Sequence, residues 1–242
     1  HTRYIGDWSS DVCSSDLALS LIFFIPFIFI ALSDQKLRHS KFDDNLLHDH
    51  LNVKLQTRDI IKDKKFYIYL PLSIAAPFIS TGLMFHQIYI FEQKDWSLEM
   101  LGNGYILLGF FSIIGLLIGG PLIDKLDTKK TAITVLLPLS LSVIVLLLFD
   151  SVFFLILYMS LYGFNMGIST PFIGSLWAEV YGVKSLGTVK ALLHAGAVFA
   201  SALSPLVFGY IIDWGYGITE IAIISLLIII VSTLLPIYNK LP

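Results

Sequence analysis

The chain has 242 residues, of which 56% are hydrophobic and only 14% are charged, whereas soluble domains carry about 25% charged residues. Lysine and arginine number 16 against 18 aspartates and glutamates, which gives a net charge of −2 and excludes the basic face that nucleic acid requires. The mean hydropathy of +0.79 excludes disorder and indicates that lipid surrounds much of the chain. A single cysteine, Cys13, excludes a disulfide framework and a multi-cysteine metal site. We expect neither a metal nor a cofactor.

The first seventeen residues do not read as part of the folded protein. Residues 7–17, DWSSDVCSSDL, match the translation of a common sequencing-library adapter, and the chain begins with His1 rather than with methionine. A natural polar tail would not account for this string. We therefore expect residues 1–17 to be an adapter artefact, and we set them aside as one sets aside a tag. We also expect the natural chain to continue upstream of Ala18.

Apolar segments follow one another along the rest of the chain. A helix needs about 20 apolar residues to cross the hydrocarbon core of a bilayer. Residues 18–32 fall short of this length, and we expect a truncated transmembrane helix there. A signal peptide is disfavoured because no small-residue cleavage site follows. After a polar segment, residues 33–65, we expect six full spans, all helical because irregular backbone is not tolerated in lipid. They are Phe66–Phe91, Leu98–Ile123, Thr131–Phe149, Val152–Ala178, Gly187–Ile212 and Ile218–Tyr238.

The charges of the connecting segments predict the orientation. Fourteen of the 16 lysines and arginines fall on one set: residues 33–65, 124–130 and 179–190 and the C-terminal tail. The opposite set holds only Lys94, since Arg3 belongs to the adapter-like segment. By the positive-inside rule, we expect the polar segment and the C-terminus to be cytoplasmic, with the chain in the plasma (inner) membrane.

Small residues are distributed unevenly among the six spans. They let transmembrane helices approach closely, and four spans are rich in them, whereas Thr131–Phe149 and Ile218–Tyr238 contain no glycine. We therefore expect the third and sixth spans to lie outside, facing lipid, and the other four to pack together.

The segment after the second span carries a recognisable motif. Residues 120–130, GPLIDKLDTKK, resemble the loop motif G-x-L-x-D-R/K-x-G-R/K-R/K of the major facilitator superfamily, but Asp127 stands where the family has glycine. Ser204-Pro205 with Gly209, near the outer end of the fifth span, is similar to a Gly/Pro-rich segment of that family. The whole arrangement resembles the C-terminal half of such a transporter.

This resemblance implies an all-α membrane fold, the six-helix half of a twelve-helix transporter. It implies that residues 18–32 end the sixth helix, that residues 33–65 form the cytoplasmic central loop, and that residues 66–242 form the six-helix C-terminal domain. The missing N-terminal half of the same chain would then be a partner, together with the bilayer. A six-helix membrane protein that does not transport, such as a sensor or an assembly subunit, is the alternative from a different class.

The implied function is secondary transport of a small solute by alternating access, not catalysis. Trp177 to Gly182, with Leu186 to Thr188, resembles a turn in some transporters of small organic anions, so we expect an anion such as a monocarboxylate. A drug or sugar exporter stays open, and a coupling proton is a further candidate partner. An integral-membrane enzyme would need clustered histidines or carboxylates near one face, which the spans lack, so we expect no catalytic residue.

Polar side chains inside the spans are the candidates for substrate binding, because they are costly in hydrocarbon. Asn165 could exchange hydrogen bonds with a substrate or only with another helix. His86 and Gln87 lie in the outer third of the first span, where histidine could serve proton coupling or anion binding or simply meet water. His194 lies in the inner part of the fifth span and could contact substrate or form a structural hydrogen bond.

Three charged residues are expected to gate transport. Asp124 and Lys125 belong to the loop motif, and the resemblance implies ion pairs there that change with conformation. Glu179 ends the fourth span on the cytoplasmic side and could pair with Lys184 or Lys190. No arginine lies in any span, so we expect the cation that binds an anionic substrate to come from the missing half.

Overall fold

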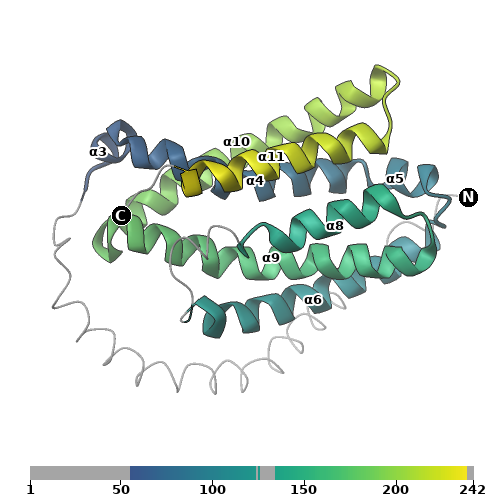
Figure 1. Ribbon diagram of the computed structural model, residues 1–242, viewed down its shortest axis with the longest axis horizontal. Coiled ribbons are helices and arrows are strands. Elements are labelled where there is room, and N and C mark those ends of the chain that lie inside the picture. Colours follow the sequence, from purple (N-terminus) through teal and green to yellow (C-terminus); the bar gives the residue numbers. More distant parts are fainter. Residues whose placement is uncertain (1–54, 124, 126–133, 239–242) are drawn as a thin grey trace, which may run out of the picture. The chain divides into compact units, whose positions relative to one another are not determined.

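The computed structural model describes residues 55–123, 125 and 134–238, which all belong to one compact unit, Asn52–Pro242. Every regular element among them is a helix (Figure 1), which confirms the predicted fold class. The adapter-like segment, the truncated helix, residues 33–54 of the polar segment, Asp124 and most of the loop motif lie outside the described residues. Five helices are long and apolar enough to cross a membrane: α4 (Lys64–Phe85), α6 (Glu99–Ile123), α9 (Val152–Tyr181), α10 (Leu186–Asp213) and α11 (Ile218–Tyr238).

The first predicted span is divided in two. α4 ends before His86, whose backbone leaves the helical region at φ −98° and ψ 19°, and α5 (Gln87–Gln93) follows. The Nδ1 atom of His86 lies 3.0 Å from the carbonyl oxygen of Gly82, which also accepts the backbone N–H of His86. The side chain of His86 therefore adds a second polar contact to a carbonyl at the end of α4.

The third predicted span is interrupted near its start. α8 (Leu137–Leu148) has only 12 residues, because Thr134 is helical whereas Val135 and Leu136 form a turn. Pro138 accounts for this turn, since proline has no N–H for the carbonyl four residues earlier and its ring clashes with that carbonyl. The carbonyl of Val135 accepts a hydrogen bond of 2.9 Å from the side-chain nitrogen of Asn165 on α9.

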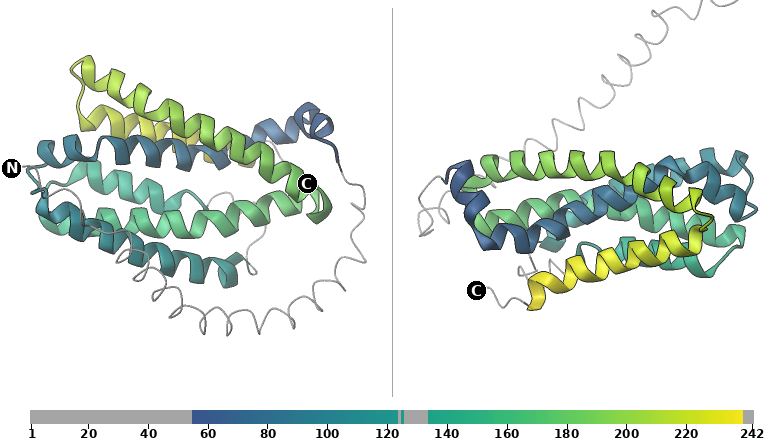
Figure 2. Two further views of the ribbon diagram at one scale, coloured as in Figure 1. Left: turned by 180° about the vertical axis from the view of Figure 1, so that it is seen from behind. Right: turned by 90° about the horizontal axis from the view of Figure 1, so that it is seen from above.

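The helices pack in two groups, which are joined by α11 and by contacts of α9 with α4 and α10 (Figures 1 and 2). α6 lies along α9, which also contacts α8, while α4 lies along α10, and α11 contacts both α4 and α8. We call the two ends of this bundle the α3 end, after α3 (Thr57–Lys62), and the α5 end. At the α3 end, η1 (Val183–Ser185) joins α9 to α10, and the hydroxyl of Ser185 accepts the backbone N–H of Leu55 at 3.0 Å.

The seam between α6 and α9 is a contact between helix backbones. A Cβ atom added to Gly163 on α9 would lie 2.7 Å from the Cα of Leu108, and one added to Gly167 would lie 2.8 Å from the backbone nitrogen of Leu116. Only glycine leaves room for this approach, which is how small residues act between membrane helices.

Burial within the described bundle does not follow the number of small residues, and the lipid-facing positions expected for the third and sixth spans stay a prediction. Of the residues in the 18-residue apolar stretch of each helix, 11% are buried in α6 and 17% in α10, whereas 33% are buried in α11. α6 uses the glycines of one face only, because a Cβ at Gly102, Gly109 or Gly120 would have no neighbour within 4 Å. The number of small residues in a helix therefore does not predict how much of its surface is covered.

Candidate functional site

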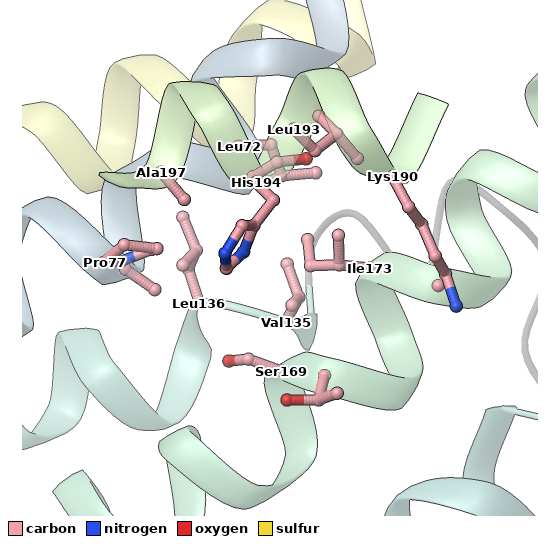
Figure 3. Close-up of a pocket in the computed structure, with 14 residues that line it drawn as sticks. Leu72, Pro77, Val135, Leu136, Ser169, Ile173, Lys190, Leu193, His194 and Ala197 are labelled. Atoms are coloured by element: carbon pink, nitrogen blue, oxygen red, sulfur yellow. The ribbon is translucent and has the colours of Figure 1, made fainter. Parts of the chain in front are cut away.

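A cavity of about 490 Å³ lies between α4, α9, α10 and the turn that precedes α8 (Figure 3). This volume falls within the range of small-molecule sites, which is about 300–1,000 Å³. α4 contributes Leu72, Ala76 and Pro77 to the wall, and the turn contributes Val135 and Leu136. Most of the lining is therefore apolar and suits a short hydrocarbon group.

The polar lining comes from three helices, because α4 adds Ser73 to the polar residues of α9 and α10. α10 supplies Lys190 and His194, which are one helical turn apart, and α9 supplies Ser169 and Thr170. The hydroxyl of Ser169 donates to the main-chain oxygen of Asn165 at 2.7 Å, so its own oxygen can still accept a hydrogen bond. None of the described residues that line the cavity is acidic, so the cavity offers positive charge and hydrogen-bond donors.

The ammonium group of Lys190 lies over a glycine. A Cβ added to Gly174 on α9 would be 3.9 Å from the Nζ atom of Lys190, at ordinary contact distance, so only a side chain larger than alanine would displace the lysine head group. Lys190 and His194 lie about 6 Å and 12 Å along α10 from Leu186, at about 1.5 Å per residue. Both are exposed, and a charge facing hydrocarbon is costly. Their side of α10 therefore suits a water-filled space or another part of a protein.

His194 is the predicted site residue that the structure places in the cavity. Figure 3 shows its imidazole directed toward the wall that Leu136 and Val135 form. Sequence reasoning missed Lys190 as a cavity residue. It counted Lys190 with the connecting segment and as a possible partner of Glu179, although the predicted span Gly187–Ile212 contains it, as α10 does. Its spacing of four residues from His194 was the available signal. A cationic side chain thus lines the cavity of this chain, and a cation supplied by the missing half stays a prediction.

Asn165 lies beside the cavity rather than in its lining. Its side chain is 2% exposed, and its amide nitrogen donates to the carbonyl of Val135. This is the interhelical hydrogen bond that the sequence left open as the alternative to a substrate contact.

His86 and Gln87 lie away from the cavity and face different helices. His86 packs against Phe208 on α10, with ring centroids 6.4 Å apart. Gln87 is 2% exposed, and its side-chain oxygen accepts a hydrogen bond of 3.0 Å from the hydroxyl of Tyr105 on α6. The structure does not bring these two residues together with His194, and their contact with substrate stays a prediction.

The gating residues are only partly described. Lys125 is exposed just after α6, and Glu179 is exposed near the end of α9. Asp124 lies outside the described residues. The ion pairs expected for these three residues stay predictions.

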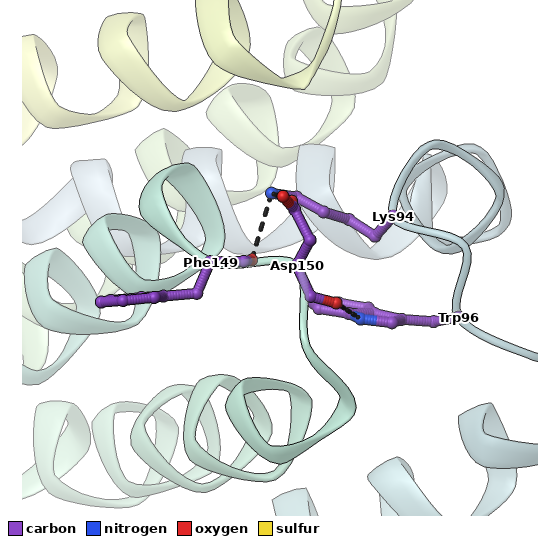
Figure 4. Close-up of polar contacts among 4 residues, drawn as sticks. All are labelled: Lys94, Trp96, Phe149 and Asp150. Atoms are coloured by element: carbon purple, nitrogen blue, oxygen red, sulfur yellow. Dashed lines mark hydrogen bonds and ion pairs between the residues drawn. The ribbon is translucent and has the colours of Figure 1, made fainter.

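The α5 end carries a cluster of polar contacts between two loops (Figure 4). The ammonium group of Lys94 forms an ion pair of 2.5 Å with Asp150 and donates to the carbonyl of Phe149 at 3.2 Å. The indole nitrogen of Trp96 donates to the carbonyl of Asp150 at 2.5 Å. The cluster connects the loop before α6 to the loop before α9. We interpret it as structural, because the polar groups of Lys94 and Trp96 bind the backbone and side chain of the second loop.

Metal binding finds no support in the described part of the chain, which contains no group of three or more histidine, cysteine or acidic residues placed to hold an ion. In a comparison with protein families, a family model described as Major Facilitator Superfamily matches residues 54–240. A comparison with curated proteins gave no significant match.

Proposed function

Because the chain belongs to the major facilitator superfamily of membrane transporters, we propose that it serves the secondary transport of a small organic anion, such as a monocarboxylate. The observation that carries this proposal is the cavity with Lys190 and His194 on one helix and no acidic residue among its described lining. An ammonium group is a compact charge with three donors, and it would hold a carboxylate while the apolar wall holds the rest of the molecule.

Alternating access places the substrate near the middle of the membrane between two halves that rock against each other. Lys190, His194 and Thr170 all lie on exposed positions of α9 and α10, so a second half would close the cavity over them. We propose that this half is the N-terminal half of the same chain. We also propose that the protein lies in the plasma (inner) membrane, with the α3 end and the C-terminus in the cytoplasm, since the basic segments predict that orientation.

Uptake of radiolabelled monocarboxylates by the full-length protein in proteoliposomes tests the substrate class. We expect Lys190→Met to raise the KM for the anion at least about tenfold, which corresponds to 1.4 kcal/mol, and Lys190→Arg to retain more of the affinity. Lys62→Met on α3 is the matched control, because it removes a lysine that does not line the cavity. An unchanged KM in Lys190→Met would overturn the assignment of this site.

Two further arms of the same assay address coupling and the rival class. An imposed proton gradient that drives accumulation, with loss on adding a protonophore, is expected if a proton is co-transported. Accumulation that is indifferent to the protonophore would remove the proton from the mechanism. Binding of the anion without any accumulation would point instead to a membrane sensor.

A further inference from the structure

We infer that Asn165 is a positioning residue that sets the length of substrate the cavity accepts, by holding the turn at Val135 and Leu136 against α9. This inference rests on the proposed anion transport. It assigns to Asn165 a role other than contact with the substrate. The inference is carried by the contact of the buried amide of Asn165 with the carbonyl of Val135 in the turn before α8. Val135 and Leu136, the two residues of this turn, also form part of the cavity wall.

The carbonyl of Val135 takes its donor from a neighbouring helix. The carbonyl of Leu136 accepts the backbone N–H of Ser140 at 2.9 Å, as in a regular helix, whereas the carbonyl of Val135 accepts the side-chain amide of Asn165 on α9. Val135 and Leu136 are each 1% exposed and Asn165 is 2% exposed, so all three residues are buried. A buried carbonyl that loses its donor must find another one or move. The amide of Asn165 therefore fixes the backbone of Val135 in its present position.

The position of this backbone determines the shape of the cavity. Figure 3 shows Lys190 at one side of the lining residues and Pro77 at the other, with Val135 and Leu136 between them. A carboxylate held at Lys190 would extend its hydrocarbon chain along Val135 and Leu136. Moving the turn would shorten or lengthen this path without altering the charge at Lys190, so chain-length selectivity would change while the requirement for an anion would not.

Unbranched monocarboxylates of two to eight carbons are added as competitors while the full-length protein takes up a radiolabelled monocarboxylate. Their apparent affinities measure the selectivity for chain length. We expect Asn165→Ala to change the ratio of apparent affinities for long and short acids at least about fivefold, since single methylene groups in an apolar pocket already discriminate about tenfold or more. Asn165→Gln keeps an amide donor and should retain more of the wild-type ratio.

Ser142→Ala is the matched control. The hydroxyl of Ser142 also donates from a buried side chain across the α8–α9 contact, to the carbonyl of Tyr158 at 3.2 Å, but Ser142 does not line the cavity. Its loss should leave the ratio unchanged. A ratio in Asn165→Ala no different from that in Ser142→Ala would overturn the inference.

A second variant keeps the test decisive if Asn165→Ala does not fold. Val135→Ala shortens a wall side chain without removing the hydrogen bond, and it should favour longer acids. An unchanged ratio in Val135→Ala would also overturn the inference. If the wild-type protein takes up none of the acids, the proposed function itself fails and the inference fails with it, whereas normal uptake with unaltered ratios refutes only the inference.

Discussion

Replacing Gly163 by alanine tests whether backbone contact between α6 and α9 holds this bundle together. The added Cβ would lie 2.7 Å from the Cα of Leu108, whereas carbon atoms pack best at about 3.5–4.0 Å. The atom in the way is backbone and cannot rotate aside, so the two helices must separate by about 1 Å. The neighbouring approach of Gly167 to α6 would loosen with it.

The expected loss follows from two opposing effects. Overpacking a tight contact costs about 1–3 kcal/mol, and the upper part of that range applies because backbone atoms clash. Alanine regains about 1 kcal/mol of helix propensity over glycine. We therefore expect Gly163→Ala to lower the free energy of unfolding by about 2 kcal/mol. Gly109→Ala gains the same propensity with no neighbour within 4 Å of the new atom, so it should raise stability by up to about 1 kcal/mol.

Thermal unfolding of the two variants in detergent provides the comparison. A difference of about 3 kcal/mol corresponds to about 6–12 °C in Tm for a chain of this size, with Gly109→Ala the more stable. Equal Tm values for the two variants would refute the reasoning, because they would show that α6 and α9 can separate at no cost.

Two more predictions concern side-chain contacts. Trp96→Phe should lower the free energy of unfolding by about 1–3 kcal/mol, through a lost buried hydrogen bond and lost volume. Lys94→Met should lower the free energy of unfolding by less, about 1 kcal/mol or below, because its partner Asp150 is 78% exposed and water screens the ion pair. Chemical denaturation that finds Lys94→Met less stable than Trp96→Phe would contradict this. Gly174→Leu should displace the head group of Lys190 and raise the KM for the anion about tenfold. Gly174→Ala should transport normally, because its Cβ would lie at ordinary contact distance from the head group. Equal KM values for the two variants in uptake assays would refute the placement of the ammonium group.

The hydrophobic pattern predicts most of this fold, because crossing a membrane imposes both length and helical structure. The sixth predicted span, Ile218–Tyr238, coincides with α11, and the predicted family is confirmed. The breaks at His86 and at Val135 were not predicted. Each is stabilised by a side-chain hydrogen bond to a backbone carbonyl, and such pairings depend on three-dimensional neighbours rather than on hydropathy.

The candidate site was predicted only in part, for reasons that differ by residue. His194 was found because a histidine inside an apolar span is conspicuous. Lys190 was missed because a charge near the start of a span was counted with the connecting segment, although both the predicted span and α10 contain it. Asn165 was conspicuous for the same reason as His194, yet its amide is bonded to Val135, so polarity within a span does not separate a binding group from a positioning group.

The surfaces of α6 and α10 bear on what must cover the described helices. The exposed face of α6 is apolar, with residues such as Ile106, Phe110 and Leu117, and lipid could cover it. The exposed face of α10 starts with Lys190 and His194 and continues with apolar residues toward the α5 end. Lipid alone would leave the cationic part of that face in hydrocarbon or force the lysine to reach for the interface. The second protein half that we propose would enclose a water-accessible cavity over the cationic part of this face and cover its apolar part.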